Sequence, residues 1–243
     1  MRPLVTALGL LVGWEVLVRL TGVPVFILPP PSTVLAVMVE RHDLLAAQAA
    51  WTAAEMLLGL ALGLVLGAGL AVVFAASAGW RRWALPLVIV SQAIPVIALA
   101  PLLVLWLGYG MASKVAMAAL VIFFPVVSAL YDGLRRTERG WLDLARTMDA
   151  PPLAILLQIR LPAALPAFAS GARIAAAVAP IGAVIGEWVG ASAGLGYLVT
   201  LSLARGQTPL AFAALVVLCL LGLALYYATD WAGRVLVPWQ AQG

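Results

Sequence analysis

A chain of 243 residues that is 65% hydrophobic and only 10% charged is too apolar for a soluble domain, in which about a quarter of the residues carry charge. Its mean hydropathy of +1.10 indicates a protein whose solvent is mostly lipid. The net charge of +4 is small and dispersed, which argues against a nucleic-acid-binding protein, and the single cysteine, Cys219, excludes an internal disulfide.

Six apolar stretches are predicted to cross the membrane as helices, so the expected fold class is an all-α polytopic membrane protein. Each stretch approaches or exceeds the roughly 20 residues that a helix needs to cross the hydrocarbon core. In chain order they cover residues 3–20, 56–80, 83–113, 115–131, 161–186 and 206–229. No small-residue cleavage site follows the first stretch, so we expect it to be retained. Residues 1–243 are expected to form a single transmembrane domain.

Two charges, Glu15 and Arg19, interrupt the first stretch. They lie four residues apart on one helical face, where they can pair with each other or sit near the membrane interface. Residues 24–43 follow, and we expect them to form a turn and a short interfacial helix on the outer side of the membrane.

Arginine placement predicts the orientation, because the cytoplasmic loops of membrane proteins are enriched in Lys and Arg. With a cytoplasmic N-terminus, nine of the 14 basic residues, Arg160 among them, lie inside, and Arg173 lies within the fifth stretch. The four that lie outside are Arg19, Arg41, Lys114 and Arg205. We therefore expect a multi-pass protein of the bacterial plasma (inner) membrane with both termini in the cytoplasm. The longest cytoplasmic loop then covers about residues 132–166.

This loop is predicted to contain two short helices with a bend between them. The first helix covers Asp143 to Met148. Asp149 either ends it, because Asp tolerates the left-handed conformation, or caps a second helix that starts at Ala150 with prolines in its first turn. Periodicity alone leaves two interpretations open: a surface loop that lies on the membrane, or a docking site for a cytoplasmic partner.

No catalytic or metal site is expected in this chain. The only lysine, Lys114, does not complete the Gly-Lys-Ser/Thr end of a phosphate-binding P-loop, so energy for transport must come from a partner. The only histidine, His42, lies in a polar stretch without a second histidine to complete a metal site. Glu55, Glu187 and Asp230 lie near span ends in no evident catalytic pairing. A proton-driven secondary transporter is an alternative, but it would require ionisable residues deep in its helices.

The loop spacing resembles the EAA loop of ATP-binding cassette importer permeases, which reads Glu-Ala-Ala, three residues, Gly, nine residues, Ile, one residue, Leu-Pro. The positions that match this pattern, together with Ala150 at the bend, are Asp143, Leu144, Ala145, Asp149, Ile159, Leu161 and Pro162. Asp149 stands where the family usually has Gly. The resemblance implies that these residues belong to the coupling loop that docks on a separate ATPase subunit.

Two further segments, "SQAIPVIALAPLLVLWLGYGMASK" (residues 91–114) and "GEWVGASAGLGYL" (residues 186–198), resemble the nitrate, sulfonate, taurine and thiamine-precursor branch of these permeases. Within that branch they are most similar to permeases for pyrimidine precursors of thiamine. The resemblance implies a type I importer permease fold that translocates hydroxymethylpyrimidine or a related precursor into the cytoplasm. Permeases for aliphatic sulfonates or taurine, nitrate and riboflavin are the alternatives.

The same resemblance implies the partners. The chain is expected to form a homodimer, to bind two copies of a cytoplasmic ATPase that hold the ATP and Mg²⁺, and to receive solute from an extracytoplasmic substrate-binding protein. No cofactor is expected in this chain, and no nucleic acid is expected among its partners.

The third to fifth stretches are the candidate translocation path by resemblance. Ser91 and Gln92 are polar residues in an apolar helix that Pro95 can kink, although they can equally bond neighbouring helices. On the fifth stretch, which is rich in Gly and Ala and suited to close packing, Ser170 and Glu187 are the candidates. A nearly neutral pyrimidine needs no counter-charge, whereas a sulfonate would favour a cation along its path. Arg173 is the only cation in these stretches, near the inner end, where it can snorkel.

Overall fold

The computed structural model describes residues 2–239, and every regular element in that range is a helix. The elements are α1 (Arg2–Thr21), α2 (Pro31–Glu40), α3 (His42–Ala76), α4 (Ala78–Ser91), α5 (Val96–Leu107), α6 (Met111–Arg135), α7 (Arg139–Thr147), α8 (Pro152–Ala154), the π-helical segment η1 (Ile155–Arg160), α9 (Leu161–Trp188), α10 (Leu195–Ala204) and α11 (Thr208–Leu236). The all-α prediction is confirmed. The chain end that was predicted to be cytoplasmic includes residues 240–243, which lie outside the described residues.

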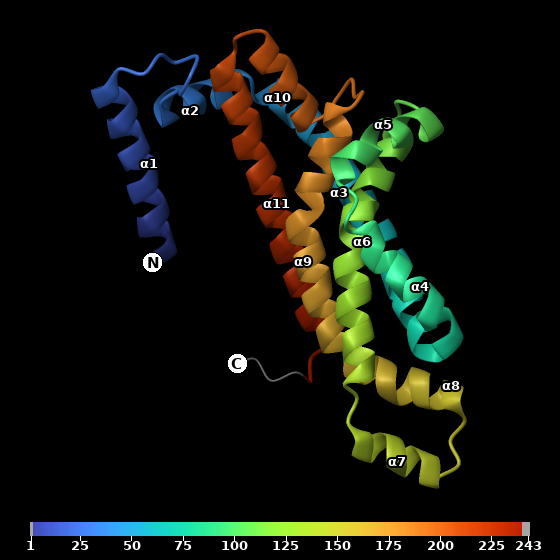
Figure 1. The fold of residues 1–243 in the computed structure, drawn as a ribbon. Helices are drawn as coiled ribbons and strands as arrows, with labels where there is room; N and C mark the ends of the chain where they lie inside the picture. Colours follow the sequence, from blue (N-terminus) through green and yellow to red (C-terminus); the bar gives the residue numbers. More distant parts are fainter. Residues whose placement is uncertain (1, 240–243) are drawn as a thin grey trace.

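Four long helices, α3, α6, α9 and α11, form the bundle, and α6 and α9 pack along much of their length (Figure 1). One buried cluster between α3, α6 and α9 contains large residues of α6 and only alanines of α9: Leu60, Ala118, Ile122, Val126, Ala175, Ala176 and Ala179. Because lipid tails are as apolar as these side chains, such helices associate through close packing rather than through burial from water.

Small residues allow that close packing. Gly59, Gly63 and Gly67 follow one face of α3, and a Cβ atom on Gly63 would lie 2.5 Å from a side-chain methyl of Ile122 on α6. On α9, a Cβ on Gly182 would lie 2.7 Å from the Cα of Ala118. The predicted role of the Gly- and Ala-rich fifth stretch in close helix packing is therefore confirmed.

The bundle has two distinct ends (Figure 1). One carries α7 and α8, which project beyond the long helices, and is called the loop end below. The other carries α2 and α10 and is called the α10 end. Glycines with positive φ, Gly190 and Gly194, make the turns between α9 and α10 at the α10 end.

The predicted count of six spans is not reproduced among the described residues. Four helices are long and apolar enough to cross a membrane: α3, α6, the continuous helical run from Pro152 to Trp188, and α11. A fifth crossing is possible only if α4 and α5, which are bent by 102° at a short break, together make one span. The predicted third span over residues 83–113 is thus not one kinked helix but two helices, because the chain breaks before Pro95, which precedes α5 and has no backbone N–H to continue a helix.

The predicted second span, residues 56–80, also has different limits. The helix α3 begins at His42, so it includes the polar residues that were assigned to the outer surface, and it ends at Ala76. Ser77 then takes an extended conformation and accepts a hydrogen bond from the Trp80 backbone N–H, which starts α4. Such a serine cap stabilises a new helix start and separates the two elements. A short helix, α2, lies within residues 24–43 as predicted.

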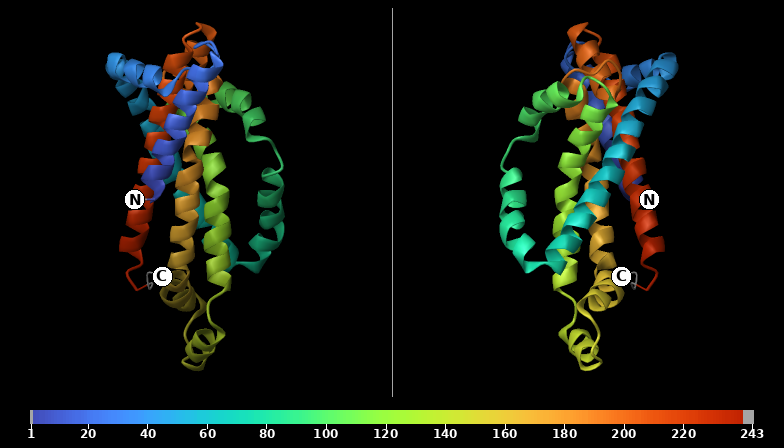
Figure 2. Two further views of the ribbon diagram at one scale, coloured as in Figure 1. Left: turned by 90° about the vertical axis from the view of Figure 1, so that its left-hand side faces the viewer. Right: turned by 90° about the vertical axis from the view of Figure 1, so that its right-hand side faces the viewer.

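The first helix, α1, stands apart from the bundle and reaches it through the ring contact of Trp14 with Phe212 on α11 (Figures 1 and 2). Its two charges are paired as predicted: Arg19 Nε donates to Glu15 Oε1 at 2.7 Å. The same carboxylate also accepts hydrogen bonds from the backbone and hydroxyl of Ser32, which fixes the turn between α1 and α2.

Candidate functional site

The loop end begins with α7, whose last turn is closed by two backbone hydrogen bonds. The N–H of Ala150 donates to the carbonyl of Ala145, and the N–H of Asp149 donates to that of Arg146, each at 3.0 Å. Asp149 adopts φ 52°, the left-handed conformation. This is the Schellman arrangement, which usually places Gly at the left-handed position. Of the two roles left open for Asp149, the structure selects the helix end, and Pro151 rather than Asp149 precedes the second helix.

The second half of the loop is helical and continuous with α9. The short α8 leads through η1 directly into Leu161 and Pro162, which occupy the first turn of α9, where a missing N–H costs little. Figure 1 shows the helical segment of α8 and η1 running outward from the base of α6, crosswise to α9. Leu156 is buried against α6, so the packing of one leucine holds this crossing segment in place.

The two loop helices expose apolar side chains that this chain does not cover. Ala145 is buried, but its neighbour Leu144 is 62% exposed, Met148 is 73% exposed and Leu153 is 65% exposed. Trp141 adds an exposed indole, and we call these four residues the loop patch. An exposed apolar patch at the tip of a polar loop is typical of an interaction site.

A basic groove lies beside this patch. It has a volume of about 760 Å³ and is lined by Arg135, Arg136, Thr137, Glu138, Arg139, Leu142, Asp143 and Arg146. Asp143 pairs with Arg146 at 3.0 Å on the exposed face of α7. With four guanidinium groups and two carboxylates, the groove favours a partner that carries acidic groups.

Arg160, the last residue of η1, connects the loop to the bundle. Its guanidinium donates to the Leu134 carbonyl in the last turn of α6, at 2.9 and 3.1 Å, and to the Ala75 carbonyl at the end of α3, at 3.5 Å. Terminal helix carbonyls have no partner within their own helix, and a cation is favourable there. A single side chain thus links the loop to the ends of two spanning helices.

Three of the predicted path residues lie together at the break between α4 and α5. Ser91 ends α4 and donates to the Val88 carbonyl, Gln92 donates to the Ser91 hydroxyl, and Pro95 precedes α5. Figure 2 shows that α4 and α5 arch away from α6 and rejoin it near both ends. No residue of α4 is buried, so much of this arch is surface that a second molecule or lipid must cover.

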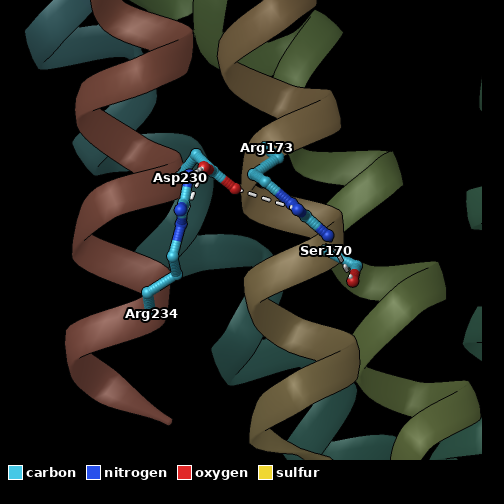
Figure 3. A network of polar contacts seen from close by, with 4 residues as sticks. All are labelled: Ser170, Arg173, Asp230 and Arg234. Carbon is cyan, nitrogen blue, oxygen red and sulfur yellow. Dashed lines mark hydrogen bonds and ion pairs between the residues drawn. The ribbon is translucent and has the colours of Figure 1, made fainter. Parts of the chain in front are cut away.

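Ser170, the fourth path candidate, takes part in a polar network between α9 and α11 (Figure 3). Arg173 donates to the Ser170 hydroxyl at 3.1 Å and to Asp230 at 2.9 Å. Arg234, one turn further along α11, donates to the other oxygen of the same carboxylate. The intramembrane cation of the fifth stretch is therefore bound to a carboxylate on the neighbouring helix and does not extend freely toward the interface.

Glu187, the fifth candidate, lies at the α10 end and is 1% exposed. Its carboxylate accepts from the Thr52 hydroxyl at 2.6 Å and from the backbone N–H groups of Gly196 and Tyr197, in the first turn of α10. Thr52 in turn accepts from the Leu195 N–H. A carboxylate at a helix N-terminus satisfies donors that the helix itself leaves unpaired. In this structure Glu187 holds α10 in place and faces no open path.

Two more buried ionisable groups surround this carboxylate. Lys114 is 2% exposed and donates to the carbonyls of Tyr109 and Gly190, at 2.6 and 3.1 Å. Glu55 on α3 is 4% exposed and interacts with both Glu187 and Lys114. Three chain segments that are distant in sequence are therefore joined at the α10 end by a charged cluster.

Sequence reasoning missed these contacts. Lys114 was assigned to the outer loop although it is buried in the first turn of α6, and Arg160 was counted only as a charge. A cation directly before or after a long apolar run is the signal that both share. That signal does not indicate which carbonyl or carboxylate the cation meets.

Similarity to known proteins agrees with this architecture. Residues 59–242 match the family described as the binding-protein-dependent transport system inner membrane component, and the chain belongs to that family. The family match, together with the membrane-spanning helices and the loop at one end of the bundle, defines the chain as the transmembrane subunit of an ATP-binding cassette importer. As a translocation subunit it is not itself the ATPase, and its partners are a separate ATPase and a substrate-binding protein.

Individual relatives match over nearly the whole chain. A probable ABC transporter permease protein of Haemophilus influenzae is 50% identical over 95% of this chain and 94% of its own. The formylaminopyrimidine transport permease protein ThiX of Halalkalibacterium halodurans is 38% identical, over 99% and 96%. The riboflavin transport system permease protein RibX of Chloroflexus aurantiacus is 37% identical, over 98% and 89%.

Among solved structures, inward-facing conformations of the MetNI methionine ABC transporter share the fold. The TM-score is 0.71 at 22% identity, with 81% of this chain and 98% of the other chain covered. The expected importer permease fold is confirmed, and with it a multi-pass protein of the inner membrane.

Proposed function

We propose that this chain forms the membrane pathway of an importer for an aminopyrimidine precursor of thiamine, such as hydroxymethylpyrimidine or its formylamino relative. The observation that carries the substrate class is the 38% identity with a formylaminopyrimidine permease over almost the full length of both chains. The riboflavin permease at 37% identity makes riboflavin the second candidate.

The ionic state of the bundle favours a solute without net charge. Arg173 and Arg234 share the carboxylate of Asp230, and Lys114 is engaged with two carbonyls, so none of these cations is free of a partner. An anionic sulfonate would require a free cation or helix N-termini directed at it. Among the described residues of the predicted path, the polar groups at the α4–α5 break, Ser91 and Gln92, are uncharged.

The loop end is proposed to be cytoplasmic and to receive the ATPase. Nine basic residues against four support this orientation. The loop patch supplies an apolar contact, and the basic groove beside it supplies charge. ATP and Mg²⁺ belong in this proposal to the ATPase, which is present in two copies. A second copy of this permease covers the exposed surface around the α4–α5 break, away from the base of α4.

Movement of the ATPase then reaches the helices through the loop. Closure of two ATPases on ATP draws two loops together, and Arg160 transmits the displacement to α6 and α3. The α4–α5 break, with Ser91, Gln92 and Pro95, lines the route by which the solute crosses.

Uptake measurements test the substrate. Cells that cannot make the thiamine pyrimidine, and whose only importer is this complex, should grow on low external hydroxymethylpyrimidine and stop growing when the permease is deleted. Riboflavin auxotrophs and cells limited to taurine or an alkanesulfonate as sulfur source are the comparison arms. The proposal would be rejected if growth on riboflavin or on the sulfur sources requires the permease while growth on hydroxymethylpyrimidine does not.

Docking is tested separately on the loop patch. Leu144→Glu places a charge on an exposed position, so the loop can fold while apolar docking is lost. Leu144→Met is the matched control. Co-purification of the ATPase should fail for Leu144→Glu and persist for Leu144→Met, with equal amounts of permease in the membrane. Normal ATPase recovery with Leu144→Glu would place the docking surface elsewhere.

A further inference from the structure

A second cavity lies at the loop end, between the start of α4 and the end of α6. It has a volume of about 740 Å³ and is lined by Ala78, Gly79, Arg81, Arg82, Leu85, Pro86, Tyr131 and Arg135. The coupling mechanism proposed above uses neither Arg81 nor Arg82. We call this cavity the α4–α6 cavity.

Its charge is not balanced within the described part of the chain. Arg81, Arg82 and Arg135 form none of the ion pairs found there, which involve Glu15, Glu40, Asp43, Asp143 and Asp230. Arg135 lies instead over the Tyr131 ring, at 5.6 Å from the ring centroid. Asp132 and Glu138, each three residues from Arg135 in the sequence, are exposed and pair with none of the three arginines.

Arg160 adds to this positive field. It interacts electrostatically with Arg81, and its own donors are occupied by the carbonyls of Leu134 and Ala75. Three guanidinium groups therefore line the cavity and no carboxylate does, while Arg160 adds positive charge nearby. Such a site is complementary to an anion.

The position of the cavity indicates what kind of anion fits. Trp80 is 67% exposed and Trp83 is 79% exposed, on either side of Arg81 and Arg82 in α4. Exposed tryptophans next to arginines at the end of an apolar helix are typical of the membrane–water interface. Leu85 and Pro86 continue the lining toward the apolar part of α4, where an acyl chain can lie.

We propose that the α4–α6 cavity binds the phosphate headgroup of an anionic phospholipid of the cytoplasmic leaflet. The guanidinium groups of Arg81, Arg82 and Arg135 hold the phosphate, and Leu85 and Pro86 contact the start of the acyl chain. Basic pockets between membrane helices on the cytoplasmic side suit anionic lipids for this reason. The lipid would tie the base of α4, which has no buried residue of its own, to α6. The assignment to the cytoplasmic leaflet rests on the proposed orientation.

Native mass spectrometry of the delipidated permease, titrated with phosphatidylglycerol or phosphatidylcholine, tests this site. The wild type should bind phosphatidylglycerol more tightly. Each arginine near an anionic membrane surface contributes about fivefold in affinity, so Arg81→Gln with Arg82→Gln should weaken phosphatidylglycerol binding by about 25-fold. Phosphatidylcholine binding should change little. If the double variant is unstable, Arg82→Gln alone is used, because this position is exposed. It should weaken phosphatidylglycerol binding by an intermediate amount, about fivefold.

The control variant carries Arg41→Gln and Arg205→Gln, which remove the same charge at the α10 end. It should keep the wild-type preference for phosphatidylglycerol. Equal losses in both double variants, or no preference in the wild type, would overturn the site. Displacement of phosphatidylglycerol by millimolar inorganic phosphate would identify a site for soluble anions and overturn the lipid assignment. These outcomes do not depend on which solute is imported, so they are distinct from a failure of the substrate proposal.

Discussion

Arg160 donates two hydrogen bonds to the carbonyl oxygen of Leu134, from Nε at 3.1 Å and from Nη2 at 2.9 Å. The two residues are 26 positions apart, with the whole of α7 and α8 between them. The bidentate contact closes the loop at its base. It also places the end of the proposed docking segment in direct contact with the end of the central helix of the bundle.

Replacement of Arg160 by Ala should uncouple the ATPase from transport. A hydrogen bond from a charged donor contributes about 1.5–3 kcal/mol, so loss of the contact should lower solute uptake by roughly tenfold or more. ATP hydrolysis by the assembled complex should persist, because the loop patch is unchanged. Uptake and hydrolysis are measured on the same proteoliposomes. Arg160→Lys, which keeps the charge but not the planar fork, should recover uptake only in part, and full uptake with Arg160→Ala would exclude the relay.

Asp149 should accept replacement by Gly and reject replacement by Val. At φ 52° Gly has no steric penalty, so Asp149→Gly should leave uptake unchanged and raise stability by up to roughly 1 kcal/mol. A β-branched side chain is strained at this φ, so Asp149→Val should open the Schellman turn and reduce ATPase binding. Thermal unfolding and ATPase co-purification measure the two effects. Equal behaviour of both variants would show that the turn conformation does not matter for coupling.

Loss of the Glu187 carboxylate should destabilise the α10 end. Glu187→Ala leaves the buried N–H of Gly196 and the partly buried N–H of Tyr197 without an acceptor, which should cost roughly 2–4 kcal/mol. Glu187→Gln retains an acceptor oxygen and should cost less. Thermal unfolding of detergent-solubilised protein gives the comparison, with Glu40→Ala on the exposed surface of α2 as control. An unchanged midpoint for Glu187→Ala would show that the carboxylate is not a structural anchor.

Gly63 and Gly69 provide a matched test of helix packing on α3. A Cβ at Gly63 would collide with Ile122, whereas nothing lies within 4 Å of a Cβ at Gly69. Gly63→Val should therefore lower stability by about 1–3 kcal/mol or prevent accumulation in the membrane, because a packed interior does not absorb extra volume. Gly69→Val should be nearly neutral. Membrane abundance and thermal unfolding of both variants decide the point, and similar losses would indicate a general effect of Val in this helix.

Cysteine labelling tests the proposed orientation. In a Cys219→Ala background, Arg205→Cys at the α10 end should react with an impermeant maleimide added to intact cells. Arg139→Cys at the loop end should react only after the membrane is opened. Labelling of the Arg139 position from outside would invert the proposed topology, and with it the side on which the ATPase binds.

Much of the site was predictable because its signals are local. The left-handed turn at Asp149 was one of two roles that its residue type predicted, because that conformation depends on a single residue, and the observed φ selects it. Glu15 and Arg19 could be paired because helix geometry brings residues four apart together. The break at Pro95 was located as a kink, but hydropathy joined α4 and α5 into one span, since apolar composition carries no information on a 102° bend.

Composition and short-range spacing were enough to predict a helical membrane protein, the loop that interrupts it and the family to which it belongs. The partners of the charged residues became evident from the folded structure, because they lie far apart in the chain. Arg173 meets Asp230 at a separation of 57 residues, and Thr52 meets Glu187 at a separation of 135. Which helices become neighbours is set by the packing of small residues across α3, α6 and α9. A buried charge in the bundle then pairs with an opposite charge or a polar group on whichever helix that packing brings close.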